Sequence, residues 1–582
     1  MEHVIHSING PVVTVKDKTN FQMLEMVYVG KQKLMGEVIA ISQLKTTIQV
    51  YESTTGLTIG EPVYATGEPI SVILGPGLMK NIFDGIERPL QMIADKSGMF
   101  IPTGSNVEPL DTKRKWEVAF EVKKGDHVEG GMIFGRIQET ASIEHRLLIP
   151  IGKSGIVQSI KPNGTYTIKD IVLVIEDKNG DKHELDLTQK WPIKTPRSFK
   201  KRLPMQMPLI SGQRVIDTLF PIAKGGTAAV PGGFGTGKTM MQHQFAKWCD
   251  ADLIVYVGCG ERGNEMTQVL EEFSDLIDPR TNKPLMERTI LIANTSNMPV
   301  AAREASIYTG VTIAEYYRDM GYHVAVMADS TSRWAEALRE ISGRLEEMPA
   351  EEGFPAYLPS RISQFYERAG YMKTHANLEG SVTIIGAVSP QGADFSEPVT
   401  QNTKRFVRSF WALDKQLAYM RHYAAINWNL SYSEYVGDLS KWYDLNVDHR
   451  FLTNRQELMA LLSEENKLLE IVKLIGSDVL PDDQKLIIEI GKVIRLGYLQ
   501  QNAFHKDDTY VPLEKQLKMM DVILYLYRKA KNYIESGKSI ALLLETGIFE
   551  HVIKMKYDVP NTELERFNQY QKKIDSTIKQ IH

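Results

Sequence analysis

The chain has 582 residues, too many for one hydrophobic core, so three or four domains are expected. A composition of 43% apolar and 24% charged residues is typical of a soluble globular protein. The net charge of −4 and the lack of a long basic run argue against nucleic-acid binding. The two cysteines, Cys249 and Cys259, fit a reducing compartment better than a disulfide framework. With no signal-peptide layout and no apolar run of ~20 residues, any membrane role is expected to act through partner chains.

The first part of the chain is predicted to be β-rich. Residues 1–72 contain short β-branched runs broken by glycines such as Gly30 and Gly56, which predicts a small closed β-barrel without a site of its own. The stretch Leu74-Gly75-Pro76-Gly77-Leu78 then predicts a turn that leads into a short helix and linker.

Residues 111–194 are rich in turn residues between β-branched runs and are predicted to form an inserted β-module. Asn163-Gly164 and Asn179-Gly180 lie between β-branched runs, so both dipeptides predict hairpins. Nothing in the module has a catalytic pattern. We expect it to be an interaction surface rather than a spacer.

In the remaining chain, the spacing of apolar residues changes near residue 435. Residues 73–110 and 195–435 are predicted to form a nucleotide-binding domain, because apolar runs alternate with helical ones as in a mostly parallel sheet. The expected strands are 253–257, 289–293, 323–328, 382–387 and 410–413. Residues 436–582 show a 3.6-residue period and are predicted to be a C-terminal helical domain, with a helix stop at Gly476-Ser477-Asp478 and a restart at Pro481-Asp482-Asp483.

One stretch matches the phosphate-binding loop G-x-x-x-x-G-K-[ST]. It consists of Gly232, Gly233, Phe234, Gly235, Thr236, Gly237, Lys238 and Thr239. A small apolar strand end precedes it and a helix-forming run follows it, which is the context that the motif requires. Backbone N–H groups at the start of a helix have no internal partner and favour phosphate oxygens. Lys238 is expected to reach the β- and γ-phosphates and Thr239 to face Mg²⁺; the alternative is a glycine-rich turn with a surface lysine.

Two strand ends carry the other candidate catalytic groups. Glu261 follows the 253–257 strand and is the candidate for orienting the attacking water and accepting its proton, while Arg262 would hold that carboxylate or a phosphate. Their alternative interpretation is an exposed turn pair. Asp329 ends the apolar strand 323–328, where Mg²⁺, directly or through water, would compensate a buried carboxylate. Its alternative role is a helix N-cap before Ser330.

These residues together resemble the catalytic A subunit of the V-type and archaeal-type rotary ATPases, over essentially the whole chain. The matching stretches are Leu74 to Leu78 with Ile82-Phe83-Asp84-Gly85, the phosphate loop, Gly260 to Glu265, Ala328 to Trp334, Gly392 to Thr400 and Leu499 to Phe504. The inserted module corresponds to the feature that separates this A subunit from its non-catalytic partner and from the F-type β subunit.

The resemblance implies a fold, a reaction and partners. The subunit would alternate with a B subunit in an A3B3 ring on the cytoplasmic face of the cell membrane, with ATP at each catalytic interface and an arginine supplied in trans. Hydrolysis or synthesis of Mg-ATP would be coupled through central and peripheral stalk subunits to proton or sodium movement in membrane subunits. Because a trans arginine contributes roughly 10³–10⁵ in rate, the chain alone is expected to be a poor ATPase.

The resemblance also implies an aromatic adenine pocket. Tyr423 and Phe504 fall on its positions, and Phe234 lies within the phosphate loop. Two departures are visible. The family's Pro-Ser-Val-Asn-Trp is Ala424-Ala425-Ile426-Asn427-Trp428 here, and Thr236 replaces the cysteine of the eukaryotic vacuolar enzymes, which favours a prokaryotic enzyme.

Three rival interpretations are weaker. An intact Lys238-Thr239 pair with Glu261 argues against a regulatory, non-catalytic subunit of the same ring. The near-neutral charge without interleaved basic and aromatic residues argues against a ring-shaped nucleic-acid translocase of the Rho kind. The inserted module and long helical C-terminus argue against a secretion-export ATPase.

Overall fold

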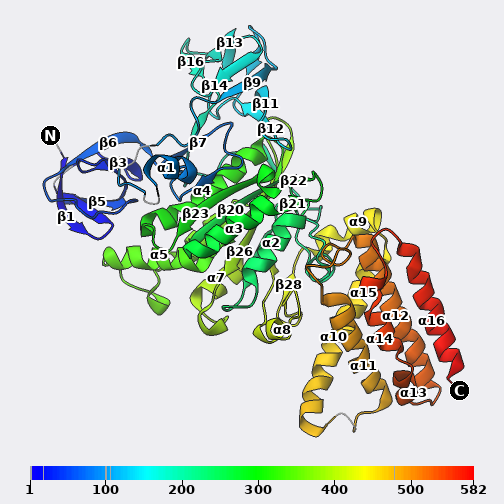
Figure 1. Cartoon of the computed structure of the whole chain (residues 1–582). Helices are drawn as coiled ribbons and strands as arrows, with labels where there is room; N and C mark the ends of the chain where they lie inside the picture. The colour runs from blue at the N-terminus through cyan, green and yellow to red at the C-terminus, as the bar shows by residue number, and fades with distance from the viewer. Residues whose placement is uncertain (1–2, 17–18, 99–100, 105–106, 477–478, 582) are drawn as a thin grey trace. The chain divides into compact units, whose positions relative to one another are not determined.

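The computed structural model describes residues 3–16, 19–98, 101–104, 107–476 and 479–581 (Figure 1). The chain divides into two compact units. The first unit contains Met1–Pro204, Lys224–Thr227 and Ala251–Val407, and the second contains Met205–Ala223, Ala228–Asp250 and Arg408–His582. The phosphate loop therefore belongs to the second unit, while Glu261 and Asp329 belong to the first.

The first unit begins with the predicted β-barrel. Six strands close it in the order β1-β2-β5-β4-β3-β6. Their bounds are β1 His3–Asn9, β2 Val12–Lys16, β3 Glu25–Val29, β4 Leu34–Ile41, β5 Lys45–Val50 and β6 Pro62–Pro69. Side chains alternate along β3, where Val27 and Val29 are fully buried in the barrel core with Leu34 and Ile48. This alternation is what the period of a strand requires when one face is apolar.

The inserted module consists of two four-stranded sheets, in the orders β10-β13-β15-β16 and β12-β11-β9-β14. The strands are β9 Lys115–Phe120, β10 His127–Val128, β11 Ile133–Gln138, β12 Glu144–Leu148, β13 Gly155–Ile160, β14 Gly164–Thr167, β15 Leu173–Glu176 and β16 Lys182–Leu185. After them, β17 (Gln189–Pro192) pairs with β7 (Ser71–Leu74).

Of the two predicted hairpins, one forms. Asn179-Gly180 joins β15 to its antiparallel neighbour β16, and Gly180 takes the left-handed φ of 86° that such a turn needs. The hairpin predicted at Asn163-Gly164 is wrong, because β14 pairs with β9 in the other sheet rather than with β13. The Asn163 carboxamide oxygen instead accepts a hydrogen bond from the Phe120 N–H, so this turn carries the chain between the two sheets.

The core of the first unit is a parallel sheet, as predicted. The parallel strands run in the order β26-β24-β20-β23-β8, and β25 extends the sheet antiparallel to β26. Their bounds are β8 Ile82–Phe83, β20 Leu253–Glu261, β23 Thr289–Thr295, β24 His323–Asp329, β25 Gly370–Lys373 and β26 Glu379–Val388. The segment predicted to be only a turn, helix and linker thus contributes β8 to the sheet edge before α1 (Leu90–Ser97) begins.

Helices cover this sheet. α4 (Val300–Asp319) contacts β20, β23, β24 and β26, and nearly all its residues are buried. α5 (Thr331–Arg344) contacts β20 and β26, while α3 (Gly263–Asp275) follows β20 (Figure 1). α6 (Leu358–Tyr366) and α7 (Pro398–Phe406) pack against each other.

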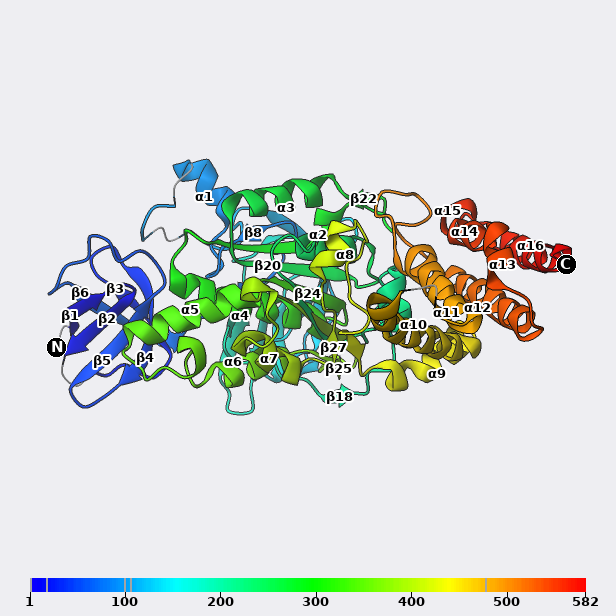
Figure 2. The same ribbon diagram turned by 90° about the horizontal axis from the view of Figure 1, so that it is seen from below.

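The second unit contains the phosphate loop and the predicted helical region. β19 (Thr227–Pro231) is parallel to β27 (Ser409–Phe410), which pairs with β28 (Tyr432–Ser433). The long helices α10, α11, α12 and α16 lie side by side (Figure 2). The helices are α2 Lys238–Trp248, α8 Lys415–Tyr419, α9 Val436–Asn446, α10 Arg450–Ile475, α11 Asp482–Val493, α12 Leu513–Glu535, α13 Ile540–Glu545, α14 Ile548–Ile553, α15 Met555–Asp558 and α16 Phe567–Gln580.

α10 ends at Ile475 and α11 begins at Asp482, while Ser477 and Asp478 of the predicted break lie outside the described residues. Within the described part of the chain, none of the helices is both long enough and apolar enough to cross a lipid bilayer.

Candidate nucleotide site

The phosphate loop lies between β19 and α2, the order that the motif requires. Gly235 and Gly237 have φ values of 77° and 85°, in the left-handed region that favours glycine. Gly232 is needed for close approach, because a Cβ there would lie 2.6 Å from the Thr236 hydroxyl oxygen and 2.8 Å from the Leu413 Cβ. The glycines thus allow a tight backbone turn that a substituted chain would not make.

Lys238 is the first residue of α2. Its ammonium group donates to the carbonyl oxygens of Gly232 at 2.7 Å and Gly233 at 3.1 Å, while the Thr236 hydroxyl donates to Gly233 at 2.8 Å. The N-cap position of α2 is Gly237, which has no side chain to cap the helix. The loop therefore presents an ammonium group and a helix amino end together, which is an arrangement suited to phosphate.

A cavity of about 610 Å³ adjoins the loop within the second unit. The loop residues Gly235 to Gly237 line one part of it. The other lining residues include Met241, Leu413, His422, Tyr423, Ala425, Gln500 to Phe504 and Tyr557. Its volume is within the usual range of small-molecule sites, and its predominantly apolar lining suits a base ring.

Tyr423 and Phe504, the two predicted aromatic residues, both line this cavity. The Phe504 side chain is 88% exposed, so its ring is available to a ligand. The Tyr423 hydroxyl is buried without a hydrogen-bond partner among the described residues, and burial raises its pKa. Sequence reasoning did not single out Gln500 to Ala503 or Tyr557, although Leu499 to Phe504 was one of the stretches behind the resemblance.

Two buried cations hold the segment that lines the cavity. Arg214 is fully buried and donates to the carbonyl oxygens of Tyr498 and Gln500 and to the Asp508 carboxylate. Lys556 donates to the carbonyl oxygens of Leu496 at 2.6 Å and Gln500 at 3.0 Å. Because both cations bind the backbone at Gln500, they fix the start of the pocket wall.

The burial of Lys556 predicts a pH dependence of stability. Burial, with the positive charge of Arg214 next, lowers the pKa of Lys556 from 10.5 to about 8. Between about pH 8 and 10.5 the unfolded chain therefore binds more protons than the folded one at this group, so its contribution to stability rises with pH. We expect Lys556→Met to remove a slope of up to ~1.4 kcal/mol per pH unit from the unfolding free energy in that window. Thermal unfolding of both proteins at pH 7.5 to 10.5 measures it; parallel pH profiles would contradict the assignment.

In the first unit, Glu261 and Asp329 are the last residues of the adjacent parallel strands β20 and β24. Gly258 is the register partner of Asp329, so Glu261 lies three residues beyond that level. Asp329 is 3% exposed and its carboxylate accepts a hydrogen bond from the Tyr256 hydroxyl at 3.1 Å. Carboxyl ends of parallel strands are where ligands bind in open α/β sheets.

The two carboxylates influence each other. Burial, then the negative charge of Asp329, then a hydrogen bond with Glu265 raise the pKa of Glu261 to about 8. The positive charge of Arg333, on α5, lowers the pKa of Glu261. Sequence reasoning missed Glu265 and Arg333, although Glu265 lies only four residues beyond Glu261. Arg262 stands at the amino end of α3 with an exposed side chain.

A phosphate loop between a strand and a helix, in a chain whose core is a parallel sheet, defines the class: a nucleotide-binding protein of the P-loop type. The match to "ATP synthase alpha/beta family, nucleotide-binding domain" covers residues 212–433. Matches to the beta-barrel domain of the same family cover 5–67, to its barrel-sandwich domain 107–194, and to "C-terminal domain of V and A type ATP synthase" 440–543.

The sequence identity to curated relatives identifies the particular family. The chain is 58% identical to the V-type ATP synthase alpha chain of Halothermothrix orenii, over 98% of this chain and 96% of that one. It is 54% identical to the A subunit of the A-type ATP synthase of Methanopyrus kandleri, over 99% of this chain and 98% of that one. The chain therefore belongs to the V-type and A-type ATP synthase alpha/A subunit family, and it is an ATP hydrolase or synthase of that type.

A solved structure agrees at the level of fold alone. The EscN ATPase of the enteropathogenic E. coli type III secretion system matches with a TM-score of 0.63 at 20% identity, covering 90% of this chain and 100% of that one. The much higher identity to ATP synthase chains, together with the matched V and A type C-terminal domain, argues against the secretion-ATPase interpretation.

Proposed function

We propose that this chain is the catalytic subunit in which Mg-ATP is hydrolysed or formed, with Lys238 and Glu261 acting on the terminal phosphate. The observation that carries the proposal is the phosphate loop, with its lysine at the start of α2 and a base-sized cavity of about 610 Å³ beside it. The Lys238 ammonium would exchange its two loop carbonyls for β- and γ-phosphate oxygens. Charge-assisted bonds of this kind are stronger than those to carbonyls.

Glu261 would orient the attacking water and accept its proton. A carboxylate whose pKa is raised toward the working pH is suited to that role, since it is basic enough to take a proton and still partly ionised. Arg262, exposed at the start of α3, would steady the phosphate or the carboxylate.

The side chains of Asp329 and Thr239 are suited to binding Mg²⁺. Asp329 is a buried carboxylate that raises the pKa of Glu261, and this repulsion is what a nearby divalent cation would relieve. No group of three or more His, Cys, Asp or Glu side chains in the described residues is arranged to hold a metal, which fits an ion bound largely by phosphates and water. Thr239 and Asp329, the latter directly or through water, would hold it. Bound there, Mg²⁺ would neutralise charge that develops on the phosphates.

The chain would work in an alternating A3B3 ring, with a B-subunit arginine completing each catalytic site. Stalk subunits and membrane subunits that move protons or sodium would complete the machine at the cytoplasmic face of the membrane. Leu474, near the end of α10, is 85% exposed, and Val479, within the break before α11, is 68% exposed. Exposed apolar side chains beside a helix break suit contact with a central stalk. Cross-linking of 474–483 to a stalk subunit tests this contact; cross-links confined to the N-terminal barrel would contradict it.

The aromatic residues of the base pocket give a separate prediction. We expect Phe504→Ala to weaken ATP and ADP binding ~3- to 10-fold, because stacking of the exposed ring contributes ~0.5–1.5 kcal/mol. Tyr423→Phe is the matched control, since it keeps the ring and removes a hydroxyl that has no partner among the described residues. Equilibrium nucleotide binding measures both; equal affinity of Phe504→Ala and wild type would remove Phe504 from the pocket.

The experiment that tests the whole proposal is ATP turnover by this chain alone and with its B subunit. Because the trans arginine contributes roughly 10³–10⁵ in rate, we expect weak activity alone and a large increase in the ring. High activity of the isolated chain, or none in an assembled ring, would overturn the assignment.

A further inference from the structure

A second cavity lies in the first unit, away from the residues assigned to catalysis. Its volume is about 650 Å³, and it is lined by the segment after β17, by α4, by α6 and the turn that follows it, and by β25. The lining contains two acidic side chains, Glu315 and Glu367, and six basic ones: Lys194, Arg197, Arg202, Arg318, Arg361 and Arg368. The excess of basic groups indicates an anionic occupant.

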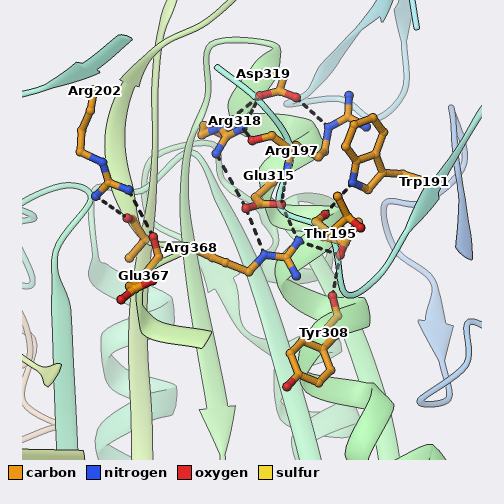
Figure 3. Close-up of polar contacts among 12 residues, drawn as sticks. Trp191, Thr195, Arg197, Arg202, Tyr308, Glu315, Arg318, Asp319, Glu367 and Arg368 are labelled. Carbon is orange, nitrogen blue, oxygen red and sulfur yellow. Dashed lines mark hydrogen bonds and ion pairs between the residues drawn. The ribbon is translucent and has the colours of Figure 1, made fainter. Parts of the chain in front are cut away.

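Part of this charge is compensated inside the wall. Arg368 binds Glu315 with two nitrogens, at 3.1 Å and 2.5 Å. Arg197 and Arg318 both bind Asp319, at 2.7 Å and 2.6 Å (Figure 3). Three guanidinium groups therefore share two carboxylates, all of them buried. Lys194, also in the lining, pairs with the buried carboxylates of Glu37 at 2.5 Å and Glu304 at 4.0 Å. This rigid network therefore compensates its own charge, and the positive charge available to a ligand is that of Arg202 and Arg361.

Arg202 and Arg361 differ from that group. Arg202 donates to the carbonyl oxygens of Ala369 and Glu367, each at 3.3 Å. Neither arginine has a carboxylate within ion-pairing distance among the residues that the structure describes. A planar guanidinium without a carboxylate partner at the edge of a cavity is suited to bidentate binding of a phosphate.

Tyr308 supplies an independent observation. Its side chain lines the cavity and is 3% exposed, and its hydroxyl has no hydrogen-bond partner among the described residues (Figure 3). Leaving a buried hydroxyl unpaired is unfavourable, so a buried hydroxyl without a protein partner usually binds water or a ligand. The Arg361 guanidinium lies close enough to interact with this hydroxyl, and the Glu304 carboxylate influences both groups. Because the hydroxyl and the guanidinium are both donors, an anion in the cavity can accept hydrogen bonds from both.

We propose that this cavity binds a small phosphate-bearing anion, held by Arg202, Arg361 and the Tyr308 hydroxyl. A small molecule fits better than an acidic peptide because the charged wall is recessed, with Arg197 and Arg318 each only 1% exposed and Arg368 only 4%. The volume is that of a small-molecule site. Inorganic phosphate, pyrophosphate and the phosphates of a nucleotide share this chemistry.

Calorimetric titration of the full chain with pyrophosphate tests the proposal. Lys238→Ala is used as the background so that the phosphate loop contributes little. We expect one site per chain, at least ~10-fold weaker binding after Arg361→Gln or Arg202→Gln, and an unchanged affinity for the control Arg344→Gln, an exposed arginine of α5. Tyr308→Phe removes one oxygen atom only, so weaker binding with an unchanged melting temperature separates ligand contact from folding.

Parallel titrations with inorganic phosphate and ADP distinguish the sources of the anion. Tighter binding of ADP than of pyrophosphate would identify a nucleotide, and the reverse order would identify a free phosphate compound. Absence of binding at ~10 mM pyrophosphate, binding that the two arginine variants leave unchanged, or binding of a glutamate-rich peptide alone would overturn the proposal.

Discussion

Glu261→Gln is expected to leave nucleotide binding intact and to lower ATP turnover ~10²- to 10⁴-fold. The substitution keeps the volume and hydrogen-bonding reach of the side chain at the end of β20. It removes the ability to accept a proton from the attacking water. Because the negative charge of Asp329 already disfavours the ionised form of Glu261, loss of that charge should not weaken binding of the anionic nucleotide and can tighten it.

The measurement is steady-state turnover in the ring reconstituted with the B subunit, beside equilibrium binding of ATP and ADP. Glu271→Gln is the matched control, since Glu271 lies on the same α3 helix but is exposed. We expect the control to retain wild-type turnover. A Glu261→Gln ring that hydrolyses ATP within ~2-fold of wild type would remove Glu261 from the mechanism, whatever its effect on binding.

Some features could be predicted from sequence because their chemistry is local. The phosphate loop is specified by glycine spacing, a lysine and flanking periodicity within about twenty residues. The strands that end at Glu261 and Asp329 are apolar runs followed by a carboxylate, and the parallel sheet follows from their alternation with helices. The roles assigned to Lys238, Glu261 and Asp329 stay predictions.

Other features depend on contacts between distant segments. β8 has two residues, too few to show a period, yet it pairs with β23, more than two hundred residues later. Asn163-Gly164 has hairpin chemistry, but β9 lies earlier in the chain and takes the pairing instead. The arginine-lined cavity joins the segment after β17 to α4 and α6, and no local pattern marks its members as neighbours.

Arg214 is the strongest example of such a non-local contact. It lies 294 residues from its ion-pair partner Asp508, and neither side chain is exposed. The same guanidinium also donates to Tyr498 and Gln500, and the Arg214 N–H donates to the Gln501 side chain at 2.9 Å. A single residue before the phosphate loop thus organises the far wall of the base pocket. It carries no motif that sequence reasoning could have recognised.

We therefore expect Arg214→Met to destabilise the second unit by ~3–5 kcal/mol, because Asp508 would remain buried without its ion-pair partner and the Tyr498 carbonyl would lose the arginine as a donor. For a unit of this size this corresponds to a decrease of roughly 6–20 °C in its melting temperature. Nucleotide affinity should fall with it, since Gln500 and Gln501 line the pocket. Calorimetry, with nucleotide binding measured well below the transition, tests both effects.

Two variants make this result interpretable. Arg450→Met removes an arginine that pairs with Asp448 and Asp521 on the surface, where its side chain is 49% exposed, so a change within ~1 kcal/mol is expected. The double variant Arg214→Met with Asp508→Leu removes both buried charges and should recover part of the lost stability, because the cost of an uncompensated carboxylate disappears. Two results would contradict this assignment. One is that Arg214→Met and Arg450→Met have the same melting temperature. The other is that adding Asp508→Leu to Arg214→Met causes a further loss of stability instead of a partial recovery.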